Sequence, residues 1–207
     1  MHTSKINHFN AWCKVIDLVL TKRHLTLDGL EEIVALKGCF PKGLNETLKA
    51  TFLHVKVKEY PEFFPSTLPL DGNWVAGFVN ADGSFSLGKK KDPKGFFGLK
   101  FACFFSVSQH NRDLHILNKI ANIFAQGRII PEAKDCFQFQ ITGAKNIGLG
   151  PNSVLNFFKN YPLHGVNYLD FNDFHLGINM LLKKEHLTSK GVNILIRLAS
   201  GMNSYRK

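Results

Sequence analysis

Apolar and polar positions after residue 73 follow two periods in turn. Residues 73–81 are small and apolar and fit a helix that Gly83 can end. From Ser84 the period changes to two, so that Phe85 and Leu87 share one side of a strand. We therefore expect a helix followed directly by a strand.

The same alternation returns in later segments. After a charged turn at 89–95, the apolar positions of a second strand are Leu99, Phe101, Cys103, Phe105 and Val107. An amphipathic helix over 112–127 closes at Gly127, a second hairpin alternates up to Thr142, and helices follow from residue 152. This order predicts an α+β domain whose sheet has one aromatic face under helices.

Two helical segments repeat within the chain. Residues 20–40 and 182–202 align without a gap and share a His-Leu-Thr triplet that ends at Thr26 and at Thr188. Each threonine can cap the second helix of a hairpin. We interpret the repeat as a duplication, so the first copy is the closing hairpin of a preceding domain. The N-terminal end then belongs to a folded helix and not to an organelle presequence.

Three prolines between residues 61 and 69 lie in a stretch that has neither a helical nor a strand period. Such a composition predicts an extended linker. We therefore divide the chain into a helical hairpin, this linker and an α+β domain, at residues 1–54, 55–72 and 73–207.

Charge points to a polyanionic partner. The 207 residues contain 26 Lys and Arg against 16 Asp and Glu, a formal net charge of +10. Nucleic acid is the first candidate, and a solvated basic surface without a specific partner is the alternative. The four cysteines lie far apart without a Cys-x-x-Cys pair, which indicates neither a zinc ribbon nor a disulfide framework. No apolar run approaches the length of a membrane span, so we expect no membrane partner.

The second face of the predicted sheet carries amides, hydroxyls and lysines, and no acid among the positions that we assign to it. Amides and hydroxyls read base edges, and cations hold phosphates. An ordinary solvated sheet face is the alternative. The residues that we expect to contact DNA are Ser84, Ser86, Lys90, Lys100, Ser106, Ser108, Gln138 and Gln140.

The helix at 73–81 ends on a lone carboxylate. Gly77 and Ala81 are four residues apart, with Ala76 beside them, and small residues at that spacing let two helices approach closely. Asp82 stands at the negative end of the helix dipole, where it costs about 0.3–1 kcal/mol. If two such helices pack together, two carboxylates meet, and hard cations such as Mg²⁺ compensate their charge. Ordinary tight packing of the helix is the alternative.

The segment 75–83, VAGFVNADG, resembles the LAGLIDADG motif, and Asn80 departs from it by replacing the first acid. The identical residues are Ala76, Gly77, Ala81, Asp82 and Gly83. The FSVSQ strand end, the glycine at 127, the YPL segment and the closing His-Leu-Thr helices also fall where the LAGLIDADG homing endonuclease family has them. The resemblance covers residues 73–207.

This resemblance implies an αββαββα fold whose saddle-shaped antiparallel sheet lies in the DNA major groove, with the motif helix at a two-fold or pseudo-two-fold interface. Asp82 matches the metal-binding acid, with Gly83 beside it in the metal site. Gln109 matches a residue that organises water near the scissile phosphate, and a plain strand-end glutamine is the alternative. The basic residue that commonly assists catalysis would fall near Asn167 and is missing.

One motif supplies one acid, so the resemblance implies half of an active site. The chain would be a Mg²⁺- or Mn²⁺-dependent, site-specific DNA endonuclease when it pairs as a homodimer or with a separate N-terminal half. The alternative is a maturase that binds intron RNA, or a cleavage-inactive remnant that still binds nucleic acid, and Asn167 favours this alternative. A truncated copy without function is a third hypothesis. The resemblance also implies an organelle-encoded protein in the mitochondrion.

Overall fold

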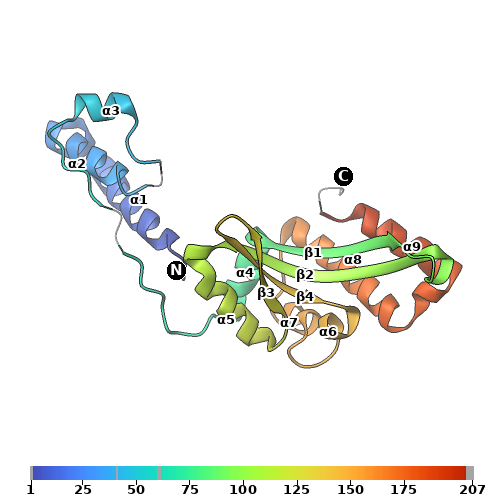
Figure 1. Cartoon of the computed structure of the whole chain (residues 1–207). Helices are drawn as coiled ribbons and strands as arrows, with labels where there is room; N and C mark the ends of the chain where they lie inside the picture. The colour runs from blue at the N-terminus through green and yellow to red at the C-terminus, as the bar shows by residue number, and fades with distance from the viewer. Residues whose placement is uncertain (1, 41, 60–61, 204–207) are drawn as a thin grey trace. The chain divides into compact units, whose positions relative to one another are not determined.

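The computed structural model describes residues 2–40, 42–59 and 62–203 (Figure 1). The chain divides into two compact units, Met1–Thr67 and Leu68–Lys207. The division falls inside the proline-rich stretch that we predicted as a linker. That this stretch acts as an extended spacer between two domains stays a prediction. Each unit has its own buried apolar cluster. Within the described residues, no helix combines the length and apolar character needed to cross a membrane.

The first unit is a small helical structure. Its helices are α1 (Lys5–Leu20), the short η1 (Arg23–Leu25), α2 (Leu27–Lys37) and α3 (Glu46–Thr51). The N–H of Lys58 donates to the carbonyl of Ala35 in α2 over 3.1 Å, and Gly38 leaves room for Val57. The first residues of the predicted linker therefore pack along α2.

The two hairpins of the internal repeat have the same turn geometry. The second hairpin consists of α8 (Gly165–Leu182), η4 (Glu185–Leu187) and α9 (Ser189–Gly201). Lys22 and Lys184 both take the left-handed conformation, with φ of 59° and 60°. The hydroxyls of Thr26 and Thr188 accept hydrogen bonds from the third N–H that follows each of them, at 3.2 and 3.0 Å. Both predicted helix caps are confirmed.

The second unit has the predicted αββαββα order. Its elements before α8 are α4 (Gly72–Asp82), β1 (Gly83–Lys91), η2 (Phe96–Gly98), β2 (Leu99–His110), η3 (Asn111–Asp113), α5 (Leu114–Phe124), β3 (Arg128–Ala133), β4 (Cys136–Thr142), α6 (Ala144–Gly148) and α7 (Val154–Asn160). The strands form one antiparallel sheet in the order β1-β2-β4-β3. The sheet is open, with β1 and β3 at its edges.

Two predicted boundaries were wrong, and a third was right. β1 continues to Lys91, because the lysines that we assigned to a turn pair with β2 as far as Leu99. α5 ends at Phe124 and not at Gly127, because Ala125 already takes the left-handed conformation with φ of 52°. The predicted end of the first helix is confirmed, because α4 ends at Asp82 and Gly83 follows it in an extended conformation, with φ of −94° and ψ of 159°.

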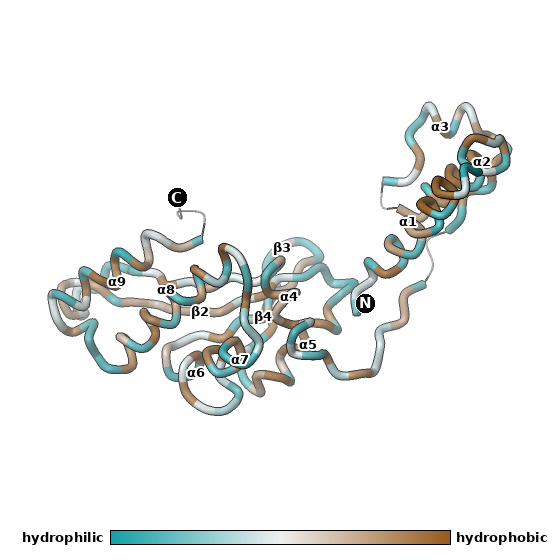
Figure 2. Tube along the Cα trace, turned by 180° about the vertical axis from the view of Figure 1, so that it is seen from behind, coloured by the Kyte–Doolittle hydropathy of each residue, from teal (hydrophilic) through white to brown (hydrophobic). Residues whose placement is uncertain are grey.

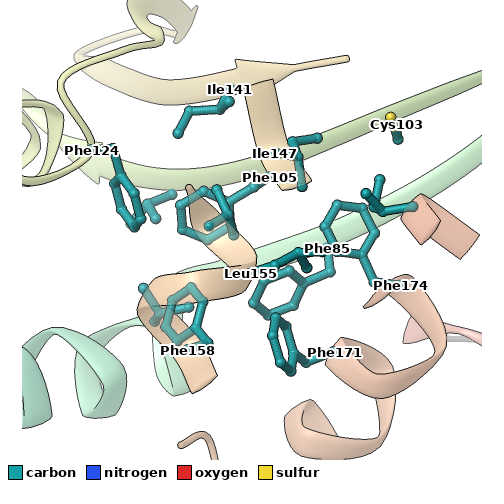
Figure 3. Close-up of a cluster of buried hydrophobic side chains, with 14 of the residues drawn as sticks. Phe85, Cys103, Phe105, Phe124, Ile141, Ile147, Leu155, Phe158, Phe171 and Phe174 are labelled. Carbon is teal, nitrogen blue, oxygen red and sulfur yellow. The ribbon is translucent and has the colours of Figure 1, made fainter. Parts of the chain in front are cut away.

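The aromatic face of the sheet is confirmed. Phe85, Phe105 and Phe139 point from β1, β2 and β4 into the core, where each is at most 2% exposed. Phe105 meets Phe124 of α5 and Phe158 of α7 edge-to-face, with ring centroids 5.5 and 5.7 Å apart. Figure 3 shows the rings of Phe105, Phe124 and Phe158 between the sheet and the helices that cover it. The opposite face of the sheet is thereby left for the polar side chains.

Candidate functional site

The motif helix α4 has one buried and one exposed side. Asp71 caps its N-terminus by accepting from the N–H groups of Asn73 and Trp74, at 2.9 and 3.1 Å. Gly77 and Ala81 are exposed, whereas Ala76 is 4% exposed and packs into the core. Ala76, which we placed with the small interface residues, therefore faces the other way, because it is one residue off their four-residue spacing.

Gly77 is not required by the packing of this chain. A Cβ built at Gly77 would meet no atom of residues 2–40, 42–59 and 62–203 within 4 Å, although glycine in a helix interior lowers stability by about 1 kcal/mol relative to alanine. Gly83 is different, because a Cβ there would lie 2.5 Å from Cγ1 of Val79. One glycine thus allows the tight passage from helix to strand, and the other keeps an exposed helix face flat.

Asp82 and Gln109, the two predicted catalytic residues, are in contact. Nε2 of Gln109 donates to Oδ2 of Asp82 over 2.7 Å. The strand register accounts for this contact, because Gly83 pairs with Val107 and Gln109 lies two residues further along the same side of β2. The carboxylate is thereby held in one orientation at the C-terminal end of α4.

Asn167 also reaches the end of the motif helix. Its Nδ2 donates to the carbonyl oxygen of Asn80, and the N–H of His164 donates to Oδ1 of Asn80 over 3.5 Å. Asn167 therefore satisfies one of the last carbonyls of α4, which have no partner within the helix. At the position where the family resemblance implies a basic side chain, this chain has Asn167. Its amide hydrogen-bonds the start of α8 to the motif helix.

The donor set around Asp82 fits part of a metal site. Carboxylate oxygen is the ligand that Mg²⁺ prefers, and the backbone carbonyl of Gly83 follows directly in the chain. Among the described residues, however, no group of three or more His, Cys, Asp or Glu side chains is placed to hold an ion. The carboxylate of Asp82 and the carbonyl of Gly83 are thus two candidate ligands for a divalent cation.

The polar face of the sheet brings most of the predicted DNA-contacting residues together. Nε2 of Gln138 donates to the hydroxyl of Ser108 over 3.3 Å, and Nε2 of Gln140 donates to Oε1 of Gln138 over 3.4 Å. Lys90 and Lys100 are register partners near the far end of the same face, and both are exposed. Their contact with DNA stays a prediction.

Within this polar face, three serines differ in exposure. Ser84 and Ser86 are half-buried on the edge strand β1. Ser106 is only 4% exposed, because it lies in the central strand β2 between its register partners Ser84 and Gln140. Its hydroxyl is therefore less accessible to a ligand than those of the edge strand.

Two charged residues of this face were not predicted from the sequence. Arg128, the register partner of Gln140, is exposed at the start of β3. Oε1 of Glu132 accepts from Nε2 of Gln138 over 2.9 Å, so the face that we expected to lack acids has a carboxylate at its β3 edge. The pairing of β3 with β4 shifts register between Pro131 and Ala133, which a simple alternation does not reveal. The sequence feature that could have indicated a charged residue on this face is Arg128, the first residue of the RIIPEA segment.

This fold and this motif helix are shared with a known class of nucleases. A family model described as LAGLIDADG endonuclease matches residues 75–176. The solved structure of the LAGLIDADG homing endonuclease I-LtrWI bound to target DNA has a TM-score of 0.86 and 32% identity, covering 100% of this chain and 68% of that chain. I-SmaMI bound to cleaved DNA has a TM-score of 0.89 and 32% identity, with the same coverage. The chain belongs to the LAGLIDADG homing endonuclease family.

Two sequence relatives are longer proteins of Neurospora crassa. "Probable intron-encoded endonuclease 2" is 30% identical over 211 residues, which cover 97% of this chain and 44% of the relative. "Probable intron-encoded endonuclease 3" is 29% identical over 192 residues, which cover 92% of this chain and 35% of the relative. The chain thus spans less than half the length of these two relatives.

Proposed function

We propose that this chain is the DNA-binding, acid-contributing half of a site-specific, divalent-metal-dependent DNA endonuclease. The contact between Gln109 and Asp82 at the end of an exposed small-residue helix carries this proposal. The solved structures bound to DNA, including one of I-SmaMI with uncleaved DNA and calcium ions, support it. The second half would come from another chain or from a longer form of this one.

The role of each residue follows from its position. Asp82 would hold the cation, with Gly83 beside it, and Gln109 would keep the carboxylate oriented through its amide N–H. The bound cation would supply charge stabilisation at the scissile phosphate. Gly77 and Ala81 would let the equivalent helix of the second half approach until the two carboxylates share the site. This arrangement explains why the described part of one chain has no complete ligand cluster.

The helical hairpin of the first unit supports the proposal that the active endonuclease contains a second half-domain. Phe9 and Trp12 of α1 align with Phe171 and Phe174 of α8, which are 5% and 0% exposed against the sheet. Phe9 and Trp12 are 45% and 53% exposed, and Figure 2 shows hydrophobic segments along α1. The side of α1 that its duplicate uses to cover a sheet thus has no such cover within its own unit. We propose that the sheet of the second half-domain covers it.

A cleavage assay tests the proposed function. The substrate is a supercoiled plasmid that carries the intronless target, in which the two exons flanking the host intron are joined. It is incubated with Mg²⁺ and the chain, with and without a second half-domain that carries its own LAGLIDADG motif. We expect double-strand cleavage with both halves, 3′ hydroxyl ends, and loss of cleavage in EDTA or with Asp82→Asn. Absence of nicking in every combination would exclude the endonuclease.

Intron RNA is the matched alternative ligand. We expect the chain to bind the joined exon duplex more tightly than the intron transcript at the same salt concentration. The reason is that the amides, hydroxyls and lysines of the polar face lie on one side of a sheet, where they can contact bases and phosphates of the DNA major groove together. Tighter binding to the transcript, unchanged by Asp82→Asn, would indicate a maturase instead. For the location of the protein, we propose the mitochondrion, supported by relatives named after introns, including one in an ND4 intron of Podospora anserina.

A further inference from the structure

A groove lies beside the part of β2 that β4 does not cover. It has a volume of about 860 Å³, and it is lined by residues of β2, of the end of β4 with the start of α6, and of the end of α8 with the turn that follows. All of these residues belong to the second unit. Neither Asp82 nor Gln109 lines the groove, so it is separate from the candidate metal site.

The main chain of β2 has an open side at this groove. Pairing with β4 stops at Phe104, although β2 begins at Leu99 (Figure 1). The N–H of Gly143 donates to the carbonyl of Cys103 over 3.0 Å, so this carbonyl points to the β4 side. Because backbone directions alternate along a strand, the N–H and C=O of Phe101 point to the same side. Within the described residues, no strand pairs with Phe101 there, and both groups face the groove.

The open stretch of β2 is short and bounded at both ends. At one end the turn between β1 and β2 covers Leu99, since a Cβ built at Gly95 would lie 2.2 Å from the carbonyl oxygen of Leu99. At the other end Gly143 occupies the carbonyl of Cys103. The stretch between these ends, residues 100–102, spans about 10 Å at about 3.4 Å per residue. An added segment of about three or four residues would fill it.

The floor of the groove is apolar. It contains Phe101 and Cys103 of β2, Ala144 of α6, and Leu181 and Leu182 of α8. Cys103 is buried, whereas the other four side chains are half-buried. An apolar side chain placed in the groove would remove the remaining surface of these four residues from water, which favours binding.

The rim of the groove is positively charged. Lys100, Lys145 and Lys184 line it and are exposed, and no Asp or Glu is among the described residues that line it. In the part of the chain that the structure describes, none of these lysines forms an ion pair. A ligand that combines an apolar part with negative charge therefore complements both the floor and the rim.

We infer that this groove binds a short, extended, acidic peptide segment of a partner protein, which adds a strand to β2 at Phe101. The apolar side chains of the segment lie on the floor, and its carboxylates lie near the lysines of the rim. Extended peptides bind open strand edges in this way, with affinity from main-chain hydrogen bonds and specificity from alternate side chains. The inference does not rest on the proposed endonuclease function, with whose predicted DNA-contacting residues the groove shares only Lys100.

Fluorescence anisotropy with the full chain tests the charge of the ligand. The probe is a labelled peptide of about six residues that alternates valine and glutamate and has blocked ends. We expect saturable binding that a peptide with lysine in place of glutamate does not show, because lysine would meet the cations of the rim. Absence of saturable binding by the valine–glutamate peptide would overturn the inference.

Methylated peptides test the added strand itself. In an antiparallel pair, the orientation that β4 takes beside β2, opposite residues share a face. The residues that bond to Phe101 are then the valines, whose side chains lie on the floor. N-methylation of every valine should weaken binding about fivefold or more, because a main-chain donor is lost. N-methylation of every glutamate should leave the affinity within about twofold. Equal affinities of the two methylated peptides would contradict strand addition.

Protein variants locate the binding. Lys145→Glu/Lys184→Asn should weaken binding of the peptide about fivefold or more, because it removes cations from the rim. Asparagine suits position 184, where φ is 60°. The control is Lys159→Glu/Lys190→Asn, which makes the same change of net charge at two exposed lysines outside the groove. Its affinity should equal that of the unsubstituted chain, and circular dichroism verifies that both variants are folded.

A fatty acid is the alternative ligand, because an apolar chain with a carboxylate also complements the floor and the rim. Binding of oleate that is lost in Lys145→Glu/Lys184→Asn, without peptide binding that is lost in the same variant, would overturn the inference in favour of a lipid. Equal peptide affinities of this variant and its control would overturn it as well. None of these measurements involves DNA or a divalent cation, so the inference and the proposed function fail independently.

Discussion

Gln109 holds the carboxylate of Asp82 through a hydrogen bond of 2.7 Å between its Nε2 and Oδ2 of the acid. The acid ends a helix whose dipole disfavours a negative charge there, so the chain keeps a locally unfavourable group and fixes its orientation. A hydrogen bond to a charged acceptor contributes about 1.5–3 kcal/mol when it forms, which offsets the dipole. The hydrogen bond thus fixes the orientation of the carboxylate to which we assign the proposed metal-binding role.

Replacing Asp82 by Asn separates stability from activity. Asn removes the charge from the helix end but accepts a weaker hydrogen bond from Gln109. These two effects oppose each other, so the free energy of unfolding should change by less than about 1 kcal/mol. Cleavage by the paired enzyme should fall at least about a hundredfold, because metal stabilisation of the phosphate is worth several kcal/mol. Asp71→Asn, at the other end of α4, is the control and should retain both properties, since asparagine is an equally good cap. Equal cleavage rates for the two variants would contradict the assignment.

Two glycines of α4 and its end should respond in opposite ways. Gly77→Ala should raise the free energy of unfolding of this chain by up to about 1 kcal/mol, because the new methyl group has no atom of the described part of the chain within 4 Å. The same methyl group should weaken association with the second half, measured by analytical ultracentrifugation. Gly83→Ala should destabilise the chain by about 1–3 kcal/mol, because its Cβ meets Val79 at 2.5 Å. A Gly77→Ala chain that associates as well as the unsubstituted one would show that this face is not the interface.

The turn of the second copy of the repeated hairpin predicts which substitutions lower the free energy of unfolding. Gly191→Ala should cost about 1–3 kcal/mol, because its Cβ would lie 2.0 Å from the carbonyl oxygen of Glu185. Thr188→Ala should cost about 1 kcal/mol through loss of the cap. Gly201→Ala is the control, since no atom of the described residues lies within 4 Å of its Cβ, and it should be neutral or stabilising. Urea unfolding measures all three, and equal midpoints for Gly191→Ala and Gly201→Ala would refute the packing explanation.

Cys103 predicts a loss of stability in alkali. Burial raises the pKa of its thiol to about 11, although a hydrogen bond from the backbone of Gly143 acts in the opposite direction. Because the pKa is raised from 9.0 on folding, the stabilising contribution is complete below pH 9 and disappears as the pH rises towards 11. The free energy of unfolding should fall by about 2–3 kcal/mol more than that of Cys103→Ala over this interval. Parallel pH profiles for the two proteins would contradict this.

Local patterns in the sequence were sufficient for the order of elements and for the faces of the sheet. The period of two assigned Phe85, Phe105 and Phe139 to one side, and all three are buried there. The repeat predicted two capped helical hairpins, and the shared left-handed residues and threonine caps confirm them. These features depend on residues close together in the chain, whose backbone geometry and side-chain direction follow from short-range sterics.

Contacts between distant residues could not be predicted in the same way. The bond from Gln109 to Asp82 joins residues 27 apart and depends on the register of β1 with β2. The bond from Asn167 to Asn80 joins residues 87 apart and depends on how α8 returns to α4. Ala76 is buried because it lies on the side of α4 that packs into the core, and a nine-residue motif does not specify which side of the helix that is.

The sequence by itself determined the fold class, the internal repeat and the family motif that ends on Asp82, because each depends on periodicity, spacing or residue identity along the chain. Only the tertiary structure decided that Gln109 meets this carboxylate, that Glu132 reaches the polar face, and that Phe97 is held exposed in a strained turn. The physical reason is that strand register, a register shift and the packing of helices on the sheet are collective properties. They result from many weak contacts between segments and from no single local pattern.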